Sequence, residues 1–382
     1  MAIALGWLQL KHQKVRLSVA IAGIAFAVTL ILMQLGFRAS LLDSSVRYLE
    51  RLNYDVAIVS IETQYLAQAV PFSSRRLYQA LGVSGVASVS PVYAARGVWK
   101  NPWDHSPRNL FMLGVDPADD VLDAPGVREY VDRVRQRDVV LFDALSRPEH
   151  GPVAAAFRNG EPIVTEVNDR EVVVGGLFEV GTSFGIEGGL LTSDDNFLRL
   201  FPRRVRTQID LGLIRVAPGA SIEAVRDAVR ALAPKDVLVL TRPELMRREQ
   251  DYWMRTTPIG AIFSFGVVIG FVVGAIIVYQ ILFADVSDHL PEYATLKAMG
   301  YSNGFVSWVV IQQAVILAVL GFLPGLAICM WLYGVVGEAT RLPMALPWER
   351  GAVVLALTTA MCAVSGMFAL RKVRALDPAD VF

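Results

Sequence analysis

The sequence predicts a membrane protein with an α-helical four-span transmembrane domain. A large α+β extracytoplasmic domain lies between spans 1 and 2, on a two-helix stalk. Of the 382 residues, 54% are hydrophobic and only 19% are charged, whereas soluble domains carry about 25% charged residues. The apolar residues are concentrated in four uncharged runs, and strand-like and helix-like patterns alternate between the first two. Lys plus Arg and Asp plus Glu balance at 36 each, which excludes a nucleic-acid binder built on excess basic charge.

The four uncharged runs are the predicted spans. They cover residues 17–37, 258–284, 305–337 and 351–370. Crossing a bilayer takes about 20 apolar residues in a helix, and each run reaches that length. The first run is too long for a signal peptide, and the sequence after it is a poor cleavage site. Residues 1–16 predict a short amphipathic helix on the cytoplasmic membrane surface.

Basic residues in the short segments set the predicted orientation. Residues 1–16 hold three Lys or Arg, the 285–304 loop holds Lys297, and the tail at 371–382 holds three more. The 338–350 loop on the other side holds two. Cytoplasmic loops are enriched in Lys and Arg. We therefore expect both termini and the 285–304 loop in the cytoplasm, and residues 38–257 and 338–350 in the periplasm.

Residues 38–257 predict one α+β domain. Strand patterns at 55–60, 86–90 and 109–115 surround a short helix at 73–81. Near the other end, strands at 209–216 and 236–240 flank a helix at 221–232 that Ser221 would cap. The repeated strand–helix–strand order predicts one subdomain built from two separated halves. A β-rich insert at about 120–200 contains a hairpin that turns at Asn168 and Asp169.

Two polar helical segments flank this domain, at 39–52 and 243–257. If each continues its neighbouring span, the pair forms the stalk. The alternative is two unrelated surface helices.

Few residues in the chain predict chemistry. No Gly-Lys dipeptide is present, which excludes a phosphate-binding P-loop. We expect a group of glycines to form hairpin turns and a flexible loop: Gly175, Gly176, Gly181, Gly185, Gly188 and Gly189. The four histidines lack metal-ligand spacing. An arginine cluster at 203–206 predicts a solvated loop, with contact to lipid head groups as the alternative. We predict no catalytic residue, no metal and no cofactor in this chain.

Glycines in the second span predict close helix packing. Gly266, Gly270 and Gly274 recur every four residues, and Gly321 and Gly325 repeat the spacing in the third span. Such spacing places the glycines on one helix face, where another backbone can approach. Chance spacing is the alternative, because glycine is common in membrane helices.

The 285–304 loop contains the start and stop signals of a short helix between Pro291 and Gly300. Pro suits the first helical position, an acidic residue the first turn and a glycine the end. The candidate contact residues of this helix are Glu292, Tyr293, Leu296, Lys297, Met299 and Gly300. The alternative is a plain connector.

These features together resemble a known family. One span, a large outside domain and three further spans are similar to the permeases of MacB-like ABC transporters, which include FtsX and the lipoprotein-release permeases. The segment 292–301, Glu-Tyr-Ala-Thr-Leu-Lys-Ala-Met-Gly-Tyr, resembles their coupling-helix motif. The tail segment 374–379, Arg-Ala-Leu-Asp-Pro-Ala, resembles their closing pattern. The amino-acid sequences of these two segments are most similar to those of the DevC group of cyanobacterial exporter permeases.

The resemblance implies a multi-pass inner-membrane permease of the mechanotransmission type (type VII), not an enzyme. A separate ABC ATPase subunit would bind ATP and Mg. Two copies of this chain would pair in membrane lipid with two ATPases. A periplasmic membrane-fusion adaptor and an outer-membrane channel would complete an exporter for a lipid-like or amphipathic cargo. The sequence does not name the cargo. The alternative is an FtsX-like regulator that activates a periplasmic hydrolase without transport. A neighbouring gene for an adaptor would favour export, and one for a hydrolase would favour regulation.

Overall fold

A computed structural model describes residues 14–289, 291, 292, 295, 299 and 301–374, which form two compact units. Described residues up to Ser40, from Ile259 to Glu338 and from Met344 onward form the helical unit. Leu41–Pro258 and Ala339–Pro343 form the large domain.

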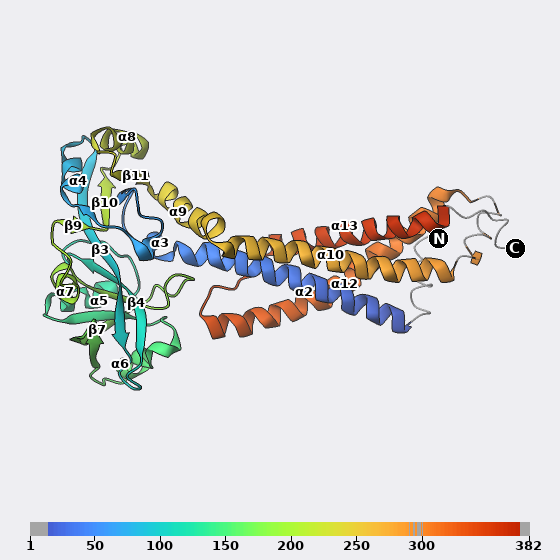
Figure 1. Cartoon of the computed structure of the whole chain (residues 1–382), viewed down its shortest axis with the longest axis horizontal. Coiled ribbons are helices and arrows are strands. Elements are labelled where there is room, and N and C mark those ends of the chain that lie inside the picture. The colour runs from blue at the N-terminus through green and yellow to red at the C-terminus, as the bar shows by residue number, and fades with distance from the viewer. Residues whose placement is uncertain (1–13, 290, 293–294, 296–298, 300, 375–382) are drawn as a thin grey trace. The chain divides into compact units, whose positions relative to one another are not determined.

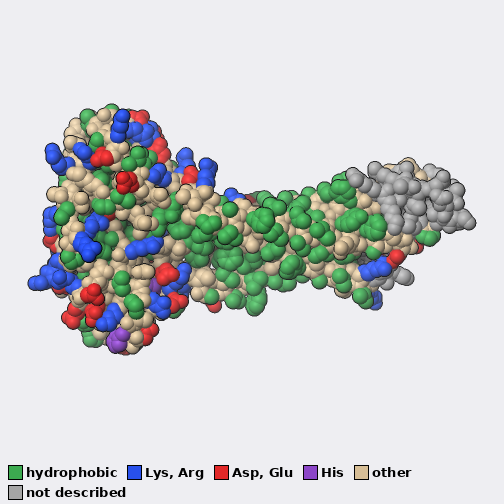
Figure 2. Space-filling model, viewed as in Figure 1, with side chains coloured by type: hydrophobic (Ala, Val, Ile, Leu, Met, Phe, Trp, Pro, Cys, Tyr) green, Lys and Arg blue, Asp and Glu red, His purple; other side chains and the backbone are tan. Residues whose placement is uncertain are grey.

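Four long helices form the described part of the helical unit (Figure 1): α2 (Lys14–Ser45), α10 (Pro258–Asp288), α12 (Asn303–Thr340) and α13 (Trp348–Arg374). All four are long and apolar enough to cross a membrane. On the face shown in Figure 2, hydrophobic side chains cover this unit, and charged side chains are spread over the large domain. Ile24, Val28 and Ile31 of α2 are buried with Val278 and Leu282 of α10 in a core of their own. The four predicted spans are confirmed.

The large domain is built on a nine-stranded mixed sheet with strand order β11-β1-β10-β3-β4-β8-β5-β7-β6. Its strands are β1 (Val56–Ser60), β3 (Val86–Lys100), β4 (Pro107–Val115), β5 (Val139–Asp143), β6 (Val164–Val167), β7 (Arg170–Phe178), β8 (Gly189–Ser193), β10 (Leu211–Val216) and β11 (Val237–Thr241). β4 pairs with β8 and β5 with β7 in parallel, and the other ladders are antiparallel. The pair Trp99↔Val167 also joins β6 to β3. The large domain between the first two spans is therefore α+β, as predicted.

Short helices and a small ribbon complete the domain. The α-helices are α3 (Arg47–Arg51), α4 (Arg75–Gln79), α5 (Val127–Tyr130), α6 (Val153–Arg158), α7 (Asp194–Leu200), α8 (Ile222–Leu232) and α9 (Arg242–Asp251). The 3₁₀ turns are η1 (Leu66–Gln68), η2 (Ala80–Gly82), η3 (Val131–Arg135) and η4 (Pro148–His150), and η5 (Tyr252–Thr256) is a π-helical turn. The ribbon pairs β2 (Phe72–Ser73) with β9 (Gln208–Ile209).

The two halves of the domain meet in one sheet. β1 lies between β10 and β11, and β10 pairs with β3. The strands of the β-rich insert continue the same sheet from β8 to β6. Helix α8 forms as predicted, because Ser221 Oγ accepts a hydrogen bond from the Ala224 N–H and caps the free end.

Two expectations about the strands are wrong. The strand expected at 86–90 runs on to Lys100, because its second half pairs with β4. Gly175 and Gly176 lie within β7 instead of in a hairpin turn. A Cβ at Gly175 would lie 2.4 Å from Val139, and one at Gly176 would lie 2.4 Å from Tyr130. Both positions therefore need glycine for close packing.

The polar segments that flank the large domain are helical. α2 continues past the predicted end of the first span to Ser45, and α3 follows after Val46. α9 begins with a capping box, in which Thr241 and Glu244 satisfy each other's backbone N–H groups, a strong helix start. The π-helical turn η5 then leads to α10 at Pro258.

Candidate functional site

The predicted coupling loop, residues 285–304, overlaps the end of α10 at Asp288 and the start of α12 at Asn303. Tyr293, Leu296, Lys297 and Gly300 lie outside the described residues. Glu292 and Met299 are described and exposed, and 62% of Met299 is accessible.

A buried polar cluster that the sequence did not predict lies at the start of the 285–304 segment, in the last turns of α10. Asp285 of α10 is buried, accepts a hydrogen bond from the Gln313 amide and lies 3.6 Å from Nδ1 of His289. Three residues further on, Asp288 pairs with Arg16 of α2. These contacts fasten the last turns of α10 to α12 and α2. The only signal in the sequence was a carboxylate directly after the uncharged run.

The predicted glycine face of α10 lies against α2. A Cβ added at Gly266 would lie 2.4 Å from Gln34, and one at Gly270 would lie 2.9 Å from Ile31. A Cβ at Gly274 would lie 2.8 Å from Cβ of Ala27 and 2.6 Å from Met361 Sδ of α13. In these α2–α10 pairs the residue numbers add up to 300 or 301, as expected for two antiparallel helices in continuous contact.

α12 also brings glycines against α2. A Cβ at Gly321 would lie 2.5 Å from Ile24, and one at Gly325 would lie 2.9 Å from Val28. Both pairs differ by 297 in residue number, so these helices run parallel. Thr29 Oγ1 donates a hydrogen bond of 3.1 Å to the Gly325 carbonyl. The glycine rows of α10 and α12 thus hold α2 between them.

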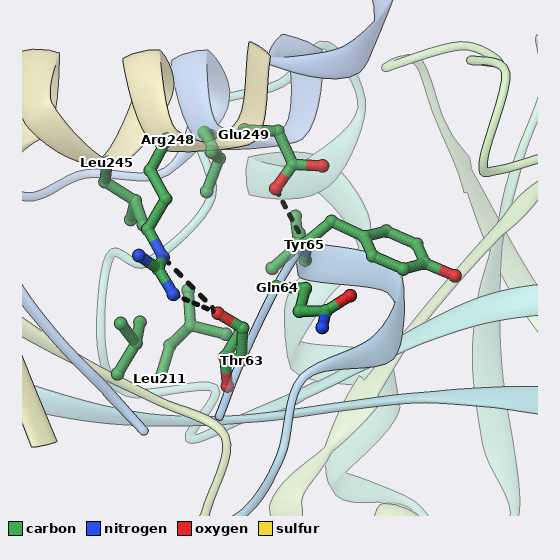
Figure 3. Close-up of a pocket in the computed structure, with 10 residues that line it drawn as sticks. Thr63, Gln64, Tyr65, Leu211, Leu245, Arg248 and Glu249 are labelled. Carbon is green, nitrogen blue, oxygen red and sulfur yellow. Dashed lines mark hydrogen bonds between the residues drawn. The ribbon is translucent and has the colours of Figure 1, made fainter. Parts of the chain in front are cut away.

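In the large domain, a second cluster joins α9 to the segment after β1 (Figure 3). Glu249 is buried, and its Oε2 accepts a hydrogen bond of 2.8 Å from the Leu66 N–H. Its Oε1 accepts one of 3.3 Å from Nε1 of Trp253. Beside it, Nη2 of Arg248 donates to the Thr63 carbonyl at 2.9 Å. α9 is therefore tied to the segment after β1 by polar side chains that directly precede the second span.

The pocket at this junction has no room for a ligand. Leu211, Leu245 and Tyr65 help to line it, and its volume is about 10 Å³. That space holds about one water molecule. The polar contacts of the junction therefore join α9 to the segment after β1.

We expect the Glu249 junction to make stability depend on pH. Burial raises the pKa of Glu249 from its ordinary value of 4.5 to about 7, although both hydrogen bonds oppose the rise. The folded protein thus holds a proton that the unfolded chain releases between these values. Stability from this group is greatest below pH 4.5 and is lost as the pH rises to about 7, by up to about 3 kcal/mol.

Thermal unfolding of the full chain in detergent, at steps from pH 5 to pH 8, measures this effect. Glu249→Gln lacks the titrating group, so wild type should lose stability relative to the variant over this interval. Parallel curves for the two proteins would contradict the assignment.

A buried carboxylate at the end of β5 organises the loop that follows β7. Asp143 accepts hydrogen bonds from the N–H groups of Leu145, Val180 and Gly181, and from the Tyr48 hydroxyl. Next to Gly181, Thr182 Oγ1 donates a hydrogen bond of 3.1 Å to a carbonyl of the segment Ala339–Pro343. The segment Ala339–Pro343, which belongs to the large domain, is thus held on the loop after β7.

The sequence predicted that the arginines at 203–206 form a solvated loop. The structure differs from this expectation. Arg204 is largely buried and pairs with the fully buried Asp210 at 2.6 Å. Burial raises the pKa of Asp210 to about 6, although Arg204 and the Ala94 N–H oppose the rise. Arg206 pairs with Asp194 and Asp195 at the start of α7. Two of the three arginines therefore hold β10 and α7 in place.

Among the described residues, no group of three or more His, Cys, Asp or Glu side chains lies close enough together to hold a metal ion.

Two family models match the chain. A model described as the MacB-like periplasmic core domain matches residues 17–232, more than half of the chain. A model described as the FtsX-like permease C-terminal region matches residues 264–378. No curated protein matches the chain.

Among solved structures, the chain is similar to the periplasmic region of MacB from Actinobacillus actinomycetemcomitans. The identity is 13% and the TM-score 0.34, over 54% of this chain and 96% of that one. It is also similar to the extracellular domain of the noncanonic ABC-type transporter YknZ from Gram-positive bacteria. Here the identity is 11% and the TM-score 0.35, over 49% of this chain and all of that one.

Proposed function

Because the chain belongs to the MacB-like and FtsX-like family of ABC permeases, we propose that it is the permease subunit of an exporter. In this proposal, a separate ABC ATPase subunit binds ATP and Mg and docks on the 285–304 loop. ATPase closure moves the four helices and, through α2 and α10, the large domain. The motion drives a lipid-like or amphipathic cargo through a periplasmic adaptor and an outer-membrane channel.

One observation carries the proposal. The family-matched large domain is inserted between the first two apolar helices, and a helix at each of its ends is tied to its sheet. α9 is fixed by the Glu249 junction, and α3 by the bond from Tyr48 to Asp143. Such an arrangement suits transmission of movement, since packed helices and sheets shift as rigid bodies. We propose the DevC group as the subgroup, because the amino-acid sequence of residues 292–301 resembles the coupling-helix motif of that group.

Purification of the tagged full chain from the membranes of the organism that produces it tests the proposed complex with an ATPase and an adaptor. In mild detergent, we expect an ABC ATPase to co-purify in equal amounts with a homodimer of this chain, together with an adaptor protein. A preparation that yields this chain with a cell-wall hydrolase and no adaptor would contradict the exporter.

The proposed orientation places both termini and the 285–304 loop in the cytoplasm. We expect Glu161→Cys, at an exposed site of the large domain, to react with a membrane-impermeant thiol reagent in intact spheroplasts. Ser302→Cys, at an exposed site of the loop, should react only after the membrane is broken. Native Cys329 and Cys362 are buried and give little background. The opposite labelling pattern would reverse the orientation.

A further inference from the structure

A polar pocket of about 540 Å³ lies beside α9 in the large domain and shares Gln64 and Arg248 with the enclosed junction at Glu249. Three arginines and two carboxylates contribute to its lining: Arg247, Arg248, Arg255, Glu244 and Asp251. Its volume falls within the range of small-molecule sites. No part of the proposed export mechanism uses it.

The charges in this pocket do not cancel. Glu244 lies 2.6 Å from Nη1 of Arg226, and Asp251 lies 3.2 Å from Nε of Arg255. Each carboxylate is thus already paired with an arginine. Among the described residues, neither Arg247 nor Arg248 forms an ion pair. The lining of three arginines and two carboxylates therefore carries one excess positive charge, which favours an anion beside Arg247 and Arg248.

Arg248 has a fixed orientation at this pocket. It donates through Nε and Nη2 to the Thr63 carbonyl and through Nη2 to the Ile61 carbonyl, bonds that hold its guanidinium without neutralising it and do not use Nη1. Arginine suits phosphate because its fork of N–H donors matches two phosphate oxygens. Gln64 and Thr256 add neutral polar groups, and the Tyr252 ring, stacked on Tyr65 at 4.5 Å, gives one wall.

The position of the pocket along the chain indicates where its ligand comes from. Arg255 and Thr256 precede Pro258, the first residue of the apolar helix α10, by three and two residues. Three residues of chain span at most about 11 Å. Because α10 is long and apolar enough to cross a membrane, Arg255 is within that reach of the point where the predicted span begins.

We infer that this pocket binds the phosphate in the head group of an amphiphile. The amphiphile would lie in the periplasmic leaflet of the inner membrane, and Arg247 and Arg248 would be the charged ligands of its phosphate. The inference goes beyond the proposed function, which does not say where the chain contacts an amphiphile. The binding test needs no ATPase, so it fails or succeeds independently of the exporter assignment.

Calorimetric titration of the purified full chain in a non-ionic detergent tests the inference. The probes are dihexanoylphosphatidylglycerol, dihexanoylglycerol without a phosphate, and inorganic phosphate. Arg247→Gln changes an exposed side chain and should weaken binding of the phospholipid about tenfold. Arg247→Gln with Arg248→Gln should weaken it further. Arg203→Gln removes an exposed arginine elsewhere in the domain and should leave the affinity unchanged.

Each arm of the titration gives a decision. Tight binding of the phospholipid alone, lost in Arg247→Gln, supports the inference. Equal affinity for inorganic phosphate would mean a free-anion site, and equal affinity for dihexanoylglycerol would mean simple apolar binding. Either result overturns the inference, as does phospholipid binding that Arg247→Gln leaves intact.

Discussion

Leu296→Asp is expected to abolish stimulation of the partner ATPase and export, while the chain still folds and inserts. In the sequence, Leu296 lies between the end of α10 at Asp288 and the start of α12 at Asn303, so we expect the change to stay outside the bilayer. In the proposed complex, burial of Leu296 in an ATPase groove contributes about 1.5–3 kcal/mol. A carboxylate at this position removes that gain and adds the cost of desolvating a charge. Docking should therefore weaken by more than about a hundredfold.

The measurement is the ATPase rate of the reconstituted complex, together with co-purification of the two subunits. Leu232→Asp is the matched control, because Leu232 ends α8 with 63% of its surface exposed. The control should retain full coupling. A Leu296→Asp protein that still co-purifies with a fully stimulated ATPase would remove the loop from the coupling path.

Gly274→Leu should be the most damaging substitution of the glycines on α10. Its Cβ would lie 2.8 Å from Cβ of Ala27, an atom that moves only with the backbone of α2. Overpacking of this kind costs about 1–3 kcal/mol. Thermal unfolding in detergent should show the loss, and the ATPase complex should form poorly. Gly266→Leu should cost less, because it meets the flexible Gln34 side chain.

Gly334→Leu is the control for this change. Gly334 lies in α12, and a Cβ there meets no atom within 4 Å. The same substitution in the same class of helix should leave stability unchanged. Equal losses at Gly274 and Gly334 would show that glycine is needed for the helix itself, and not for its contact with α2.

Local patterns in the sequence predicted the elements that local chemistry controls. The four spans follow from uncharged length, α8 from the Ser221 cap, and the β6–β7 hairpin from Asn168 and Asp169, both of which have positive φ. The extension of β3 to Lys100 depends on β4, whose pairing brings the second half of the strand into the sheet. No residue within 86–100 alone carries that information.

The buried charges were missed for a related reason. Glu249 is recognisable only once α9 lies against Leu66, which is 183 residues away in the sequence. Asp285 directly follows an uncharged run, so it reads as the polar end of a span, although the structure buries it beside α12. Arg204 reads as one member of a basic surface run until Asp210 folds beneath it. A polar residue's partner, and not its own type, decides its role.

The pairing of β1 with β11 has a mechanical consequence. Val56 faces Thr241 at one end of this antiparallel ladder, so α3 and α9 leave the sheet from the same end. A pull that displaces both helices together loads the two strands along their axes, and the ladder moves as one piece. A force that separates them acts on one rung at a time, beginning at the bond from the Arg242 N–H to the Asp55 carbonyl. The domain therefore resists deformation when α3 and α9 are pulled in the same direction. It yields more easily when the two helices are pulled apart.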